Sequence, residues 1–151
     1  MSDLLIGNAA PPPAQISDRL RFTDDTSLIP VKWGDFTGVL ARVERPERWE
    51  PASDPVTGIT LGLTGRVAFD DEMWREADAL PYQGGKACKL LLRAWLRGKP
   101  EFLNILNGVC AVLVFDPGEN ALHLITSRDG AEVYAALLTP SRGPRARHCI
   151  E

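Results

Sequence analysis

The 151-residue sequence has few of the side chains from which metal sites and catalytic triads are built. It contains two histidines and three cysteines, and no cysteine or histidine pair has the spacing of a metal site. Cys110 lies in an apolar run typical of a protein core, and His123 alternates with apolar neighbours as a strand-face or surface histidine would. We therefore expect no zinc site, no Ser-His-Asp triad and no cofactor.

The sequence also lacks the segments that direct a chain into or across a membrane. No apolar run approaches the ~20 residues of a membrane-spanning helix, and the N-terminal MSDLLIGNAAPPP lacks the basic start of a signal peptide. The net charge is -3, with no excess of basic residues. These absences predict a cytoplasmic protein with reduced thiols that binds neither nucleic acid nor a membrane.

The composition is that of an ordinary globular domain. Hydrophobic residues make up 44% of the chain and charged residues 25%. The length predicts a single domain over residues 1–151. Prolines follow one another at 11–13, and the end of the chain is rich in arginine and proline. We expect residues 1–20 and 140–151 to be loose.

Alternating apolar and polar residues predict several strands. Residues 59–69 alternate most clearly, and Gly65 interrupts their apolar positions, which indicates a bulge or a close backbone approach. The run VCAVLVF at 109–115 is typical of a strand buried on both faces. Further strands are expected at 28–31, 36–43, 121–126 and 134–138, with turns at 33–35 and 116–120 and a surface loop at 44–56.

Two helices are predicted between these strands. Asp70 and Asp71 are suited to cap a helix over 72–80, and residues 86–97 have the spacing of an amphipathic helix that ends at Gly98. A short third helix is expected after Pro100. Together, strands and helices predict an α+β domain with a largely antiparallel sheet.

The helix over 86–97 carries three basic residues at intervals of four, Lys89, Arg93 and Arg97, which we call the basic ridge. Its simplest interpretation is a solvated face. The alternative interpretation is a docking ridge for an acidic partner.

Residues 85–129 resemble the class II glutamine amidotransferase domain at the front of asparagine synthetases. The matching pieces occur in the family's order: LLLRAW at 90–95, LNG at 106–108, Ala111, FD at 115–116 and RD at 128–129. Upstream, LTGRV at 63–67 resembles the family's NGEIYN strand end. The resemblance implies an Ntn-hydrolase-like sandwich of two mainly antiparallel sheets with helices outside. It also implies a truncated domain, because the family's domain continues with further strands.

The family's catalytic chemistry is altered at several matching positions. Its nucleophile is an N-terminal cysteine exposed by removal of the initiator methionine, whereas this chain has Ser2. Its oxyanion-stabilising asparagine and glycine fall on Thr64 and Gly65, which are the substrate-binding candidates. Its ammonium-binding aspartate falls on Ala87. No motif places the family's substrate-binding arginine, and Arg42 and Arg45 are candidates because they lie in the corresponding part of the chain.

These departures favour a non-catalytic amidotransferase-like domain that is a structural or regulatory partner of a separate amide-forming synthetase. The chain lacks the synthetase's own Ser-Gly-Gly-x-Asp-Ser loop. The partner-binding candidates are Lys89, Arg93 and Arg97, and a homodimer is the alternative assembly. Two other functions stay open: an Ntn amidohydrolase that uses Ser2 to release ammonia from glutamine, and an unrelated α+β binding protein.

Overall fold

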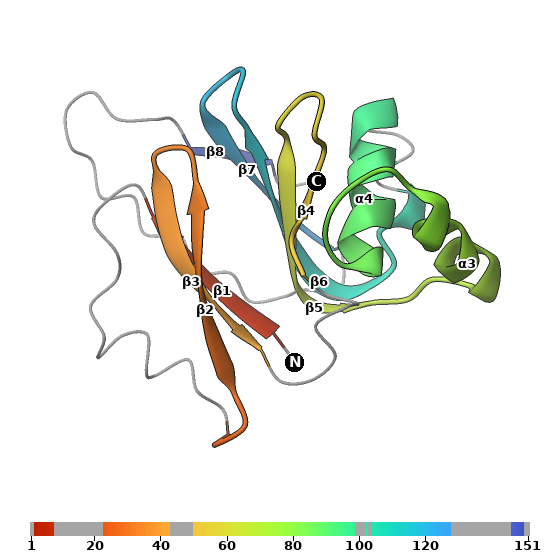
Figure 1. Ribbon diagram of the computed structural model, residues 1–151, viewed down its shortest axis with the longest axis horizontal. Helices are drawn as coiled ribbons and strands as arrows, with labels where there is room; N and C mark the ends of the chain where they lie inside the picture. Colours follow the sequence, from red (N-terminus) through yellow and green to blue (C-terminus); the bar gives the residue numbers. More distant parts are fainter. Residues whose placement is uncertain are drawn as a thin grey trace.

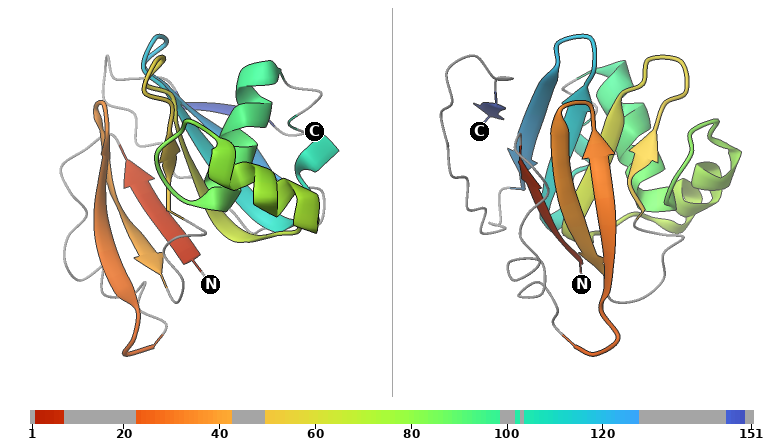
Figure 2. Two further views of the ribbon diagram at one scale, coloured as in Figure 1. Left: turned by 45° about the vertical axis from the view of Figure 1, so that its right-hand side comes forward. Right: turned by 60° about the vertical axis from the view of Figure 1, so that its left-hand side comes forward.

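The computed structural model describes residues 2–7, 23–42, 50–98, 102, 104–127 and 146–149. These residues form an α+β fold with two mainly antiparallel sheets and two long helices. The smaller sheet packs on one face of the larger sheet, and both helices lie on the opposite face (Figure 1). Figure 2 shows the same order of layers from two further directions. Among the described residues, no helix is long and apolar enough to cross a membrane.

The smaller sheet has the strand order β1-β3-β2, and all its pairs are antiparallel. It consists of β1 (Ser2–Gly7), β2 (Ser27–Trp33) and β3 (Phe36–Arg42). The two predicted strands β2 and β3 are confirmed, and Gly34 turns between them with a φ of 57° that favours glycine. β1 lies in the segment 1–20, which was predicted to be loose. Its three apolar residues in a row, at 4–6, show no alternation that would indicate a strand, and the strand forms by pairing with β3. β2 is an edge strand and carries Pro30 in its middle.

The larger sheet has the strand order β4-β5-β6-β7-β8. It consists of β4 (Ala52–Ser53), β5 (Thr60–Val67), β6 (Gly108–Asp116), β7 (Ala121–Thr126) and β8 (Ala146–Cys149). The first four strands are antiparallel, and β8 runs parallel to β7. The β6–β7 hairpin is confirmed as predicted. β4 lies inside the predicted surface loop and β8 inside the predicted loose tail, while the strand expected at 134–138 lies outside the described residues.

Both long helices begin and end close to the predicted positions. They are α3 (Asp71–Ala79) and α4 (Lys86–Arg97). The carboxylate of Asp70 accepts a hydrogen bond of 2.8 Å from the Met73 N–H, which satisfies one free donor of the first turn of α3. Gly98 ends α4 with a φ of 125°. Of the short helix expected after Pro100, the structure describes a buried Phe102 and helical residues at 104 and 105.

Two hydrophobic clusters hold the three layers together. One lies between the larger sheet and the helices, and its large members include Leu63, Leu91 and Val112. The other lies between the two sheets and consists of Trp33, Phe36, Leu113, Phe115 and Leu122. β6 contributes alternate residues to both clusters, which confirms that 110–115 is buried on both faces, whereas Val109, at the start of the predicted run, is 51% exposed. β5 was expected to bury one face only, but the smaller sheet covers its other face, so Thr60 and Gly62 are buried as well.

The loop between β4 and β5 is organised by a buried carboxylate that the sequence interpretation missed. Asp54 is 7% exposed and accepts three hydrogen bonds: from the Thr57 hydroxyl at 2.6 Å and from the Thr57 and Val56 N–H groups at 3.1 and 3.2 Å. The hydrogen bond from the Thr57 hydroxyl lowers the pKa of Asp54 below 3.8, assisted by the two N–H groups and opposed by burial. The ionised carboxylate therefore stabilises the folded state.

We expect Asp54→Asn to lower the free energy of unfolding by about 1–3 kcal/mol at pH 7. The folded-state pKa lies below the unfolded value, so this stabilisation is present above the unfolded pKa and is lost as the pH falls through the folded pKa. Urea unfolding of both proteins from neutral pH into the acid range measures it. The difference between the two should shrink as the pH falls; a constant difference would contradict the assignment. Thr57→Val, which removes the hydroxyl donor to Asp54 and the exposed acceptor of the Ile59 N–H, should show a smaller loss.

Candidate functional site

The candidate site implied by the resemblance lies at the end of the sandwich where β1 begins and β5 ends. Leu4 of β1 lies within 3.5 Å of the position that a Cβ on Gly62 of β5 would occupy, so the two strands face each other across the inter-sheet space. The start of β1 lies beside the end of β5 and the start of β6 (Figure 1). Ser2, Thr64 and Gly65 therefore share one end of the molecule, although they come from different sheets.

The pairing of β1 with β3 places an arginine at the same end of the molecule. In the β1–β3 pair, the Cα partner of Ser2 is Arg42, one of the two arginines that the sequence offered by region. Pairing across an antiparallel ladder places the two Cα atoms about 4.5–5.5 Å apart. Arg45, the other candidate, lies outside the described residues.

Gly65 is held in a conformation that other residues rarely adopt. Its φ is 84°, and a Cβ at this position would collide with the carbonyl oxygen of Val109 on β6. The predicted close backbone approach is therefore confirmed. Gly108, opposite Val67, also has a positive φ, of 131°. These two glycines let β5 and β6 approach closely at the Ser2 end of the sheet.

The side chain beside Gly65 offers less to an oxyanion than the family's asparagine would. Thr64 is half-buried and pairs with Ala111 of β6. A threonine hydroxyl supplies one rotating donor, whereas an amide supplies two donors in a fixed plane. An oxyanion site depends on donors that are already oriented, so this position is poorly suited to stabilise a tetrahedral intermediate.

The position that matches the family's ammonium-binding aspartate cannot reach a ligand. Ala87 lies in the first turn of α4, is fully buried and belongs to the cluster between the larger sheet and the helices. A carboxylate at this position would need a partner to offset its burial. The methyl group instead packs into the core, so the structure uses position 87 for stability.

The basic ridge is not one open surface. Arg93 packs between the helices with its side chain 17% exposed, and its Nη1 donates to Glu76 Oε2 of α3 at 2.8 Å. Two turns earlier, Lys86 pairs with Asp78 of α3 at 2.7 Å. Lys89 is half-buried and Arg97 is exposed in the last turn. The solvated-face interpretation is therefore wrong for Arg93, because α3 covers it.

Two cysteines and a histidine, which could in principle act as nucleophile or base, are packed against other side chains. Cys88 and Cys110 are fully buried, and burial raises the pKa of the Cys110 thiol, which makes its thiolate scarce. His123 lies on β7, with its side chain 13% exposed, against the Trp95 ring of α4 at a centroid distance of 5.3 Å. In the described part of the chain, no three His, Cys, Asp or Glu side chains are grouped to hold a metal ion.

Sequence reasoning missed the acidic partners of the basic residues on α4. Glu76 and Asp78 flank the buried Ala77 of α3 and pair with Arg93 and Lys86, respectively. Residues two apart do not share one face of a helix, so the sequence carries no local signal for these pairs.

Comparison of the chain with protein-family models, with curated proteins and with solved structures gives no match. The candidate site therefore stands on the motifs and geometry described above.

Proposed function

We propose that the chain is a non-catalytic glutamine-amidotransferase-like domain with a shortened Ntn-hydrolase-like sandwich, and that it serves a separate cytoplasmic amide-forming synthetase as a structural or regulatory partner. One observation carries the proposal. Ser2 is far in sequence from the adjacent residues Thr64 and Gly65, but both positions lie at one end of two facing sheets, as a nucleophile and its oxyanion donors would. Shared placement of two separate motifs is harder to reach by chance than either match alone.

The same positions support the absence of catalysis. A serine hydroxyl is a weaker nucleophile near neutral pH than a cysteine thiol, which is partly ionised there. Thr64 lacks the amide donor, and Ala87 is sealed in the core. Loss of a preorganised oxyanion donor alone costs about 10²–10³ in rate. Three altered groups together leave little glutaminase activity to detect.

Ammonia release from L-glutamine tests the absence of catalysis. We expect the purified protein and Ser2→Ala to release ammonia at the same background rate. Ser2→Cys alone should not restore release, because the positions of Thr64 and Ala87 remain altered. Release by the unchanged protein that disappears in Ser2→Ala would overturn the proposal and establish a serine-dependent Ntn amidohydrolase instead. Intact mass, showing whether Met1 has been removed, is the control for a free Ser2 amine.

The partnership is tested with an ATP-dependent amide-forming synthetase from the same organism. Pyrophosphate release by the synthetase, with ammonium as nitrogen donor, is measured with and without the purified chain. We expect the chain to change the rate or the stability of the synthetase and to co-elute with it. A synthetase that neither binds the chain nor changes in its presence would contradict the partnership while leaving the fold proposal intact.

A further inference from the structure

The contact between α3 and α4 contains an arginine whose hydrogen-bonding capacity is only partly used. Arg93 Nη1 donates to Glu76 Oε2, but its Nε is buried and has no hydrogen-bond partner among the described residues. A guanidinium binds a carboxylate best as a fork, with two parallel N–H donors. Glu76 therefore satisfies Arg93 incompletely, and a carboxylate that reached both Nε and Nη would bind it better.

The helix that covers Arg93 is held by a small apolar contact, through Ala77 and Trp74, and by two ion pairs. Among the described elements, α4 is the main neighbour of α3. Ala77 is the one buried residue of α3, while the side chains of Glu76 and Asp78 are 48% and 64% exposed. The pair between Lys86 and Asp78 is exposed, and exposed ion pairs contribute little stability and weaken further with salt. α3 can therefore leave α4 at a smaller free-energy cost than an element that buries a full apolar face.

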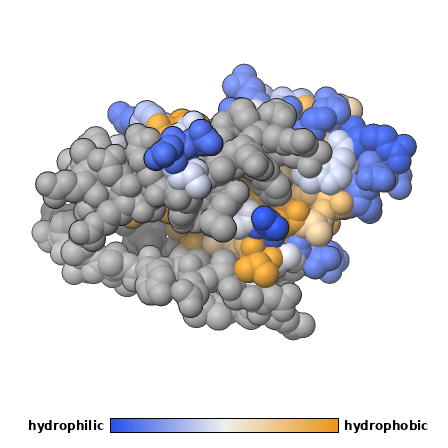
Figure 3. Space-filling view, turned by 90° about the horizontal axis from the view of Figure 1, so that it is seen from below, coloured by the Kyte–Doolittle hydropathy of each residue, from blue (hydrophilic) through white to orange (hydrophobic). Residues whose placement is uncertain are grey.

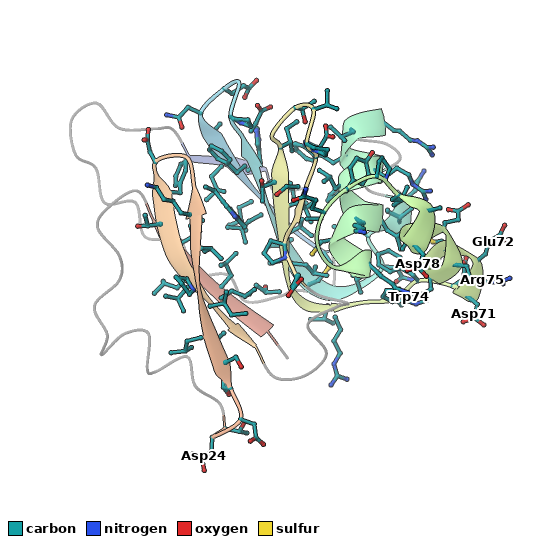
Figure 4. The ribbon with its side chains drawn as sticks, viewed as in Figure 1. Asp24, Asp71, Glu72, Trp74, Arg75 and Asp78 are labelled. Atoms are coloured by element: carbon teal, nitrogen blue, oxygen red, sulfur yellow. The ribbon has the colours of Figure 1, made fainter. Side chains whose placement is uncertain are left out.

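The outward side of α3 is strongly hydrophilic. Asp71, Glu72 and Arg75 point away from α4 at the outer end of the helix (Figure 4). The space-filling view shows the same end of the molecule as a hydrophilic surface (Figure 3). Water solvates this surface whether α3 is docked or released. The cost of release therefore lies on the inner side of α3, where Ala77 is buried and Trp74 packs against the core cluster and the Phe69 ring.

We propose that α3 is an autoinhibitory segment, in which Glu76 occupies Arg93 in place of a carboxylate from an acidic segment of the partner protein. Binding of that segment replaces Glu76 and releases α3 from α4. Lys89 and Arg97 flank Arg93 on the same helix and lie one turn away on either side. The released surface is then the complete basic ridge. The inference rests on the proposed partnership and specifies its binding surface.

The test uses a hexaglutamate peptide as the probe and the full chain at low ionic strength. Glu76→Gln removes the competing charge and keeps the shape of the side chain. We expect it to raise the affinity for hexaglutamate about two- to fivefold, the range that an exposed ion pair contributes. Glu72→Gln is the matched control, because it removes the same charge from the same helix on the side away from α4. An equal gain in both variants would overturn the proposal.

Two further measurements test the role of Arg93 in binding and the release of α3. Arg93→Gln should abolish hexaglutamate binding, and Arg93→Lys, which keeps the charge without the fork, should weaken it. Hydrogen exchange of the amides at 71–79 should accelerate when the peptide binds the unchanged protein. Unchanged exchange, or binding that survives Arg93→Gln, would contradict the inference. Because no synthetase is present, failure here is distinct from failure of the partnership.

Discussion

Gly65→Ala is expected to lower the free energy of unfolding by about 2–5 kcal/mol. Two costs add at this position. A φ of 84° is unfavourable for any residue with a Cβ, by roughly 1–2 kcal/mol. The new Cβ would also meet the Val109 carbonyl oxygen and lie 2.9 Å from Cys110 Cα, and overpacking of this kind costs about 1–3 kcal/mol. Both obstacles are backbone atoms of β6, which cannot rotate away as a side chain would.

Urea unfolding followed by circular dichroism measures the effect of Gly65→Ala. Gly7→Ala is the matched control, since Gly7 ends a strand, has no positive φ, and has no neighbouring atom within 4 Å of the position that a Cβ would occupy. We expect the control to change the stability by less than about 0.5 kcal/mol. A Gly65→Ala protein as stable as the control would show that β5 and β6 can separate at this end without loss.

Trp33→Ala is expected to cost about 3–5 kcal/mol, the range for truncating a buried tryptophan. Trp33 is 7% exposed, and its Cη2 lies 2.7 Å from the position that a Cβ on Gly62 would occupy. The absence of a side chain at 62 therefore lets the ring lie against β5. Removing the ring leaves a cavity between the two sheets, next to Phe36 and Phe115. Lys32→Ala, at an exposed position of the same strand, should be nearly neutral.

A double variant tests whether Trp33 and Gly62 form one packing unit. Gly62→Val alone should destabilise the protein, because its side chain meets the Trp33 ring. In the background of Trp33→Ala, the valine should instead fill part of the cavity. The double variant should then be more stable than the sum of the two single losses predicts. Additive losses would mean that the ring and Gly62 contribute independently.

The elements with a strong local signal were predicted correctly. α4 and β6 have, respectively, a helical period and an unbroken apolar run, and both are found where expected. The cap at Asp70 and the glycine stop at Gly98 fixed the helix boundaries to within about a residue, because each residue acts on its own turn. Local chemistry was therefore sufficient for these elements.

The elements that depend on distant parts of the chain were not predicted. β1, β4 and β8 are short or lack alternation, and each is a strand because of the strand beside it. The pairing of Glu76 with Arg93 likewise depends on how α3 and α4 pack, which no local pattern specifies. For the candidate site, sequence matches supplied Ser2, Thr64 and Gly65, whereas their common location required the arrangement of the two sheets.

Pro30 has a consequence for how the protein behaves in a crowded solution. Edge strands offer a row of free backbone groups to which another chain can add, which is a route to aggregation. β2 forms one edge of the smaller sheet, and Pro30, which is exposed, has no N–H to offer. A strand from a second molecule that approached β2 would lack a hydrogen bond at the centre of the new ladder. This edge therefore resists growth by intermolecular pairing.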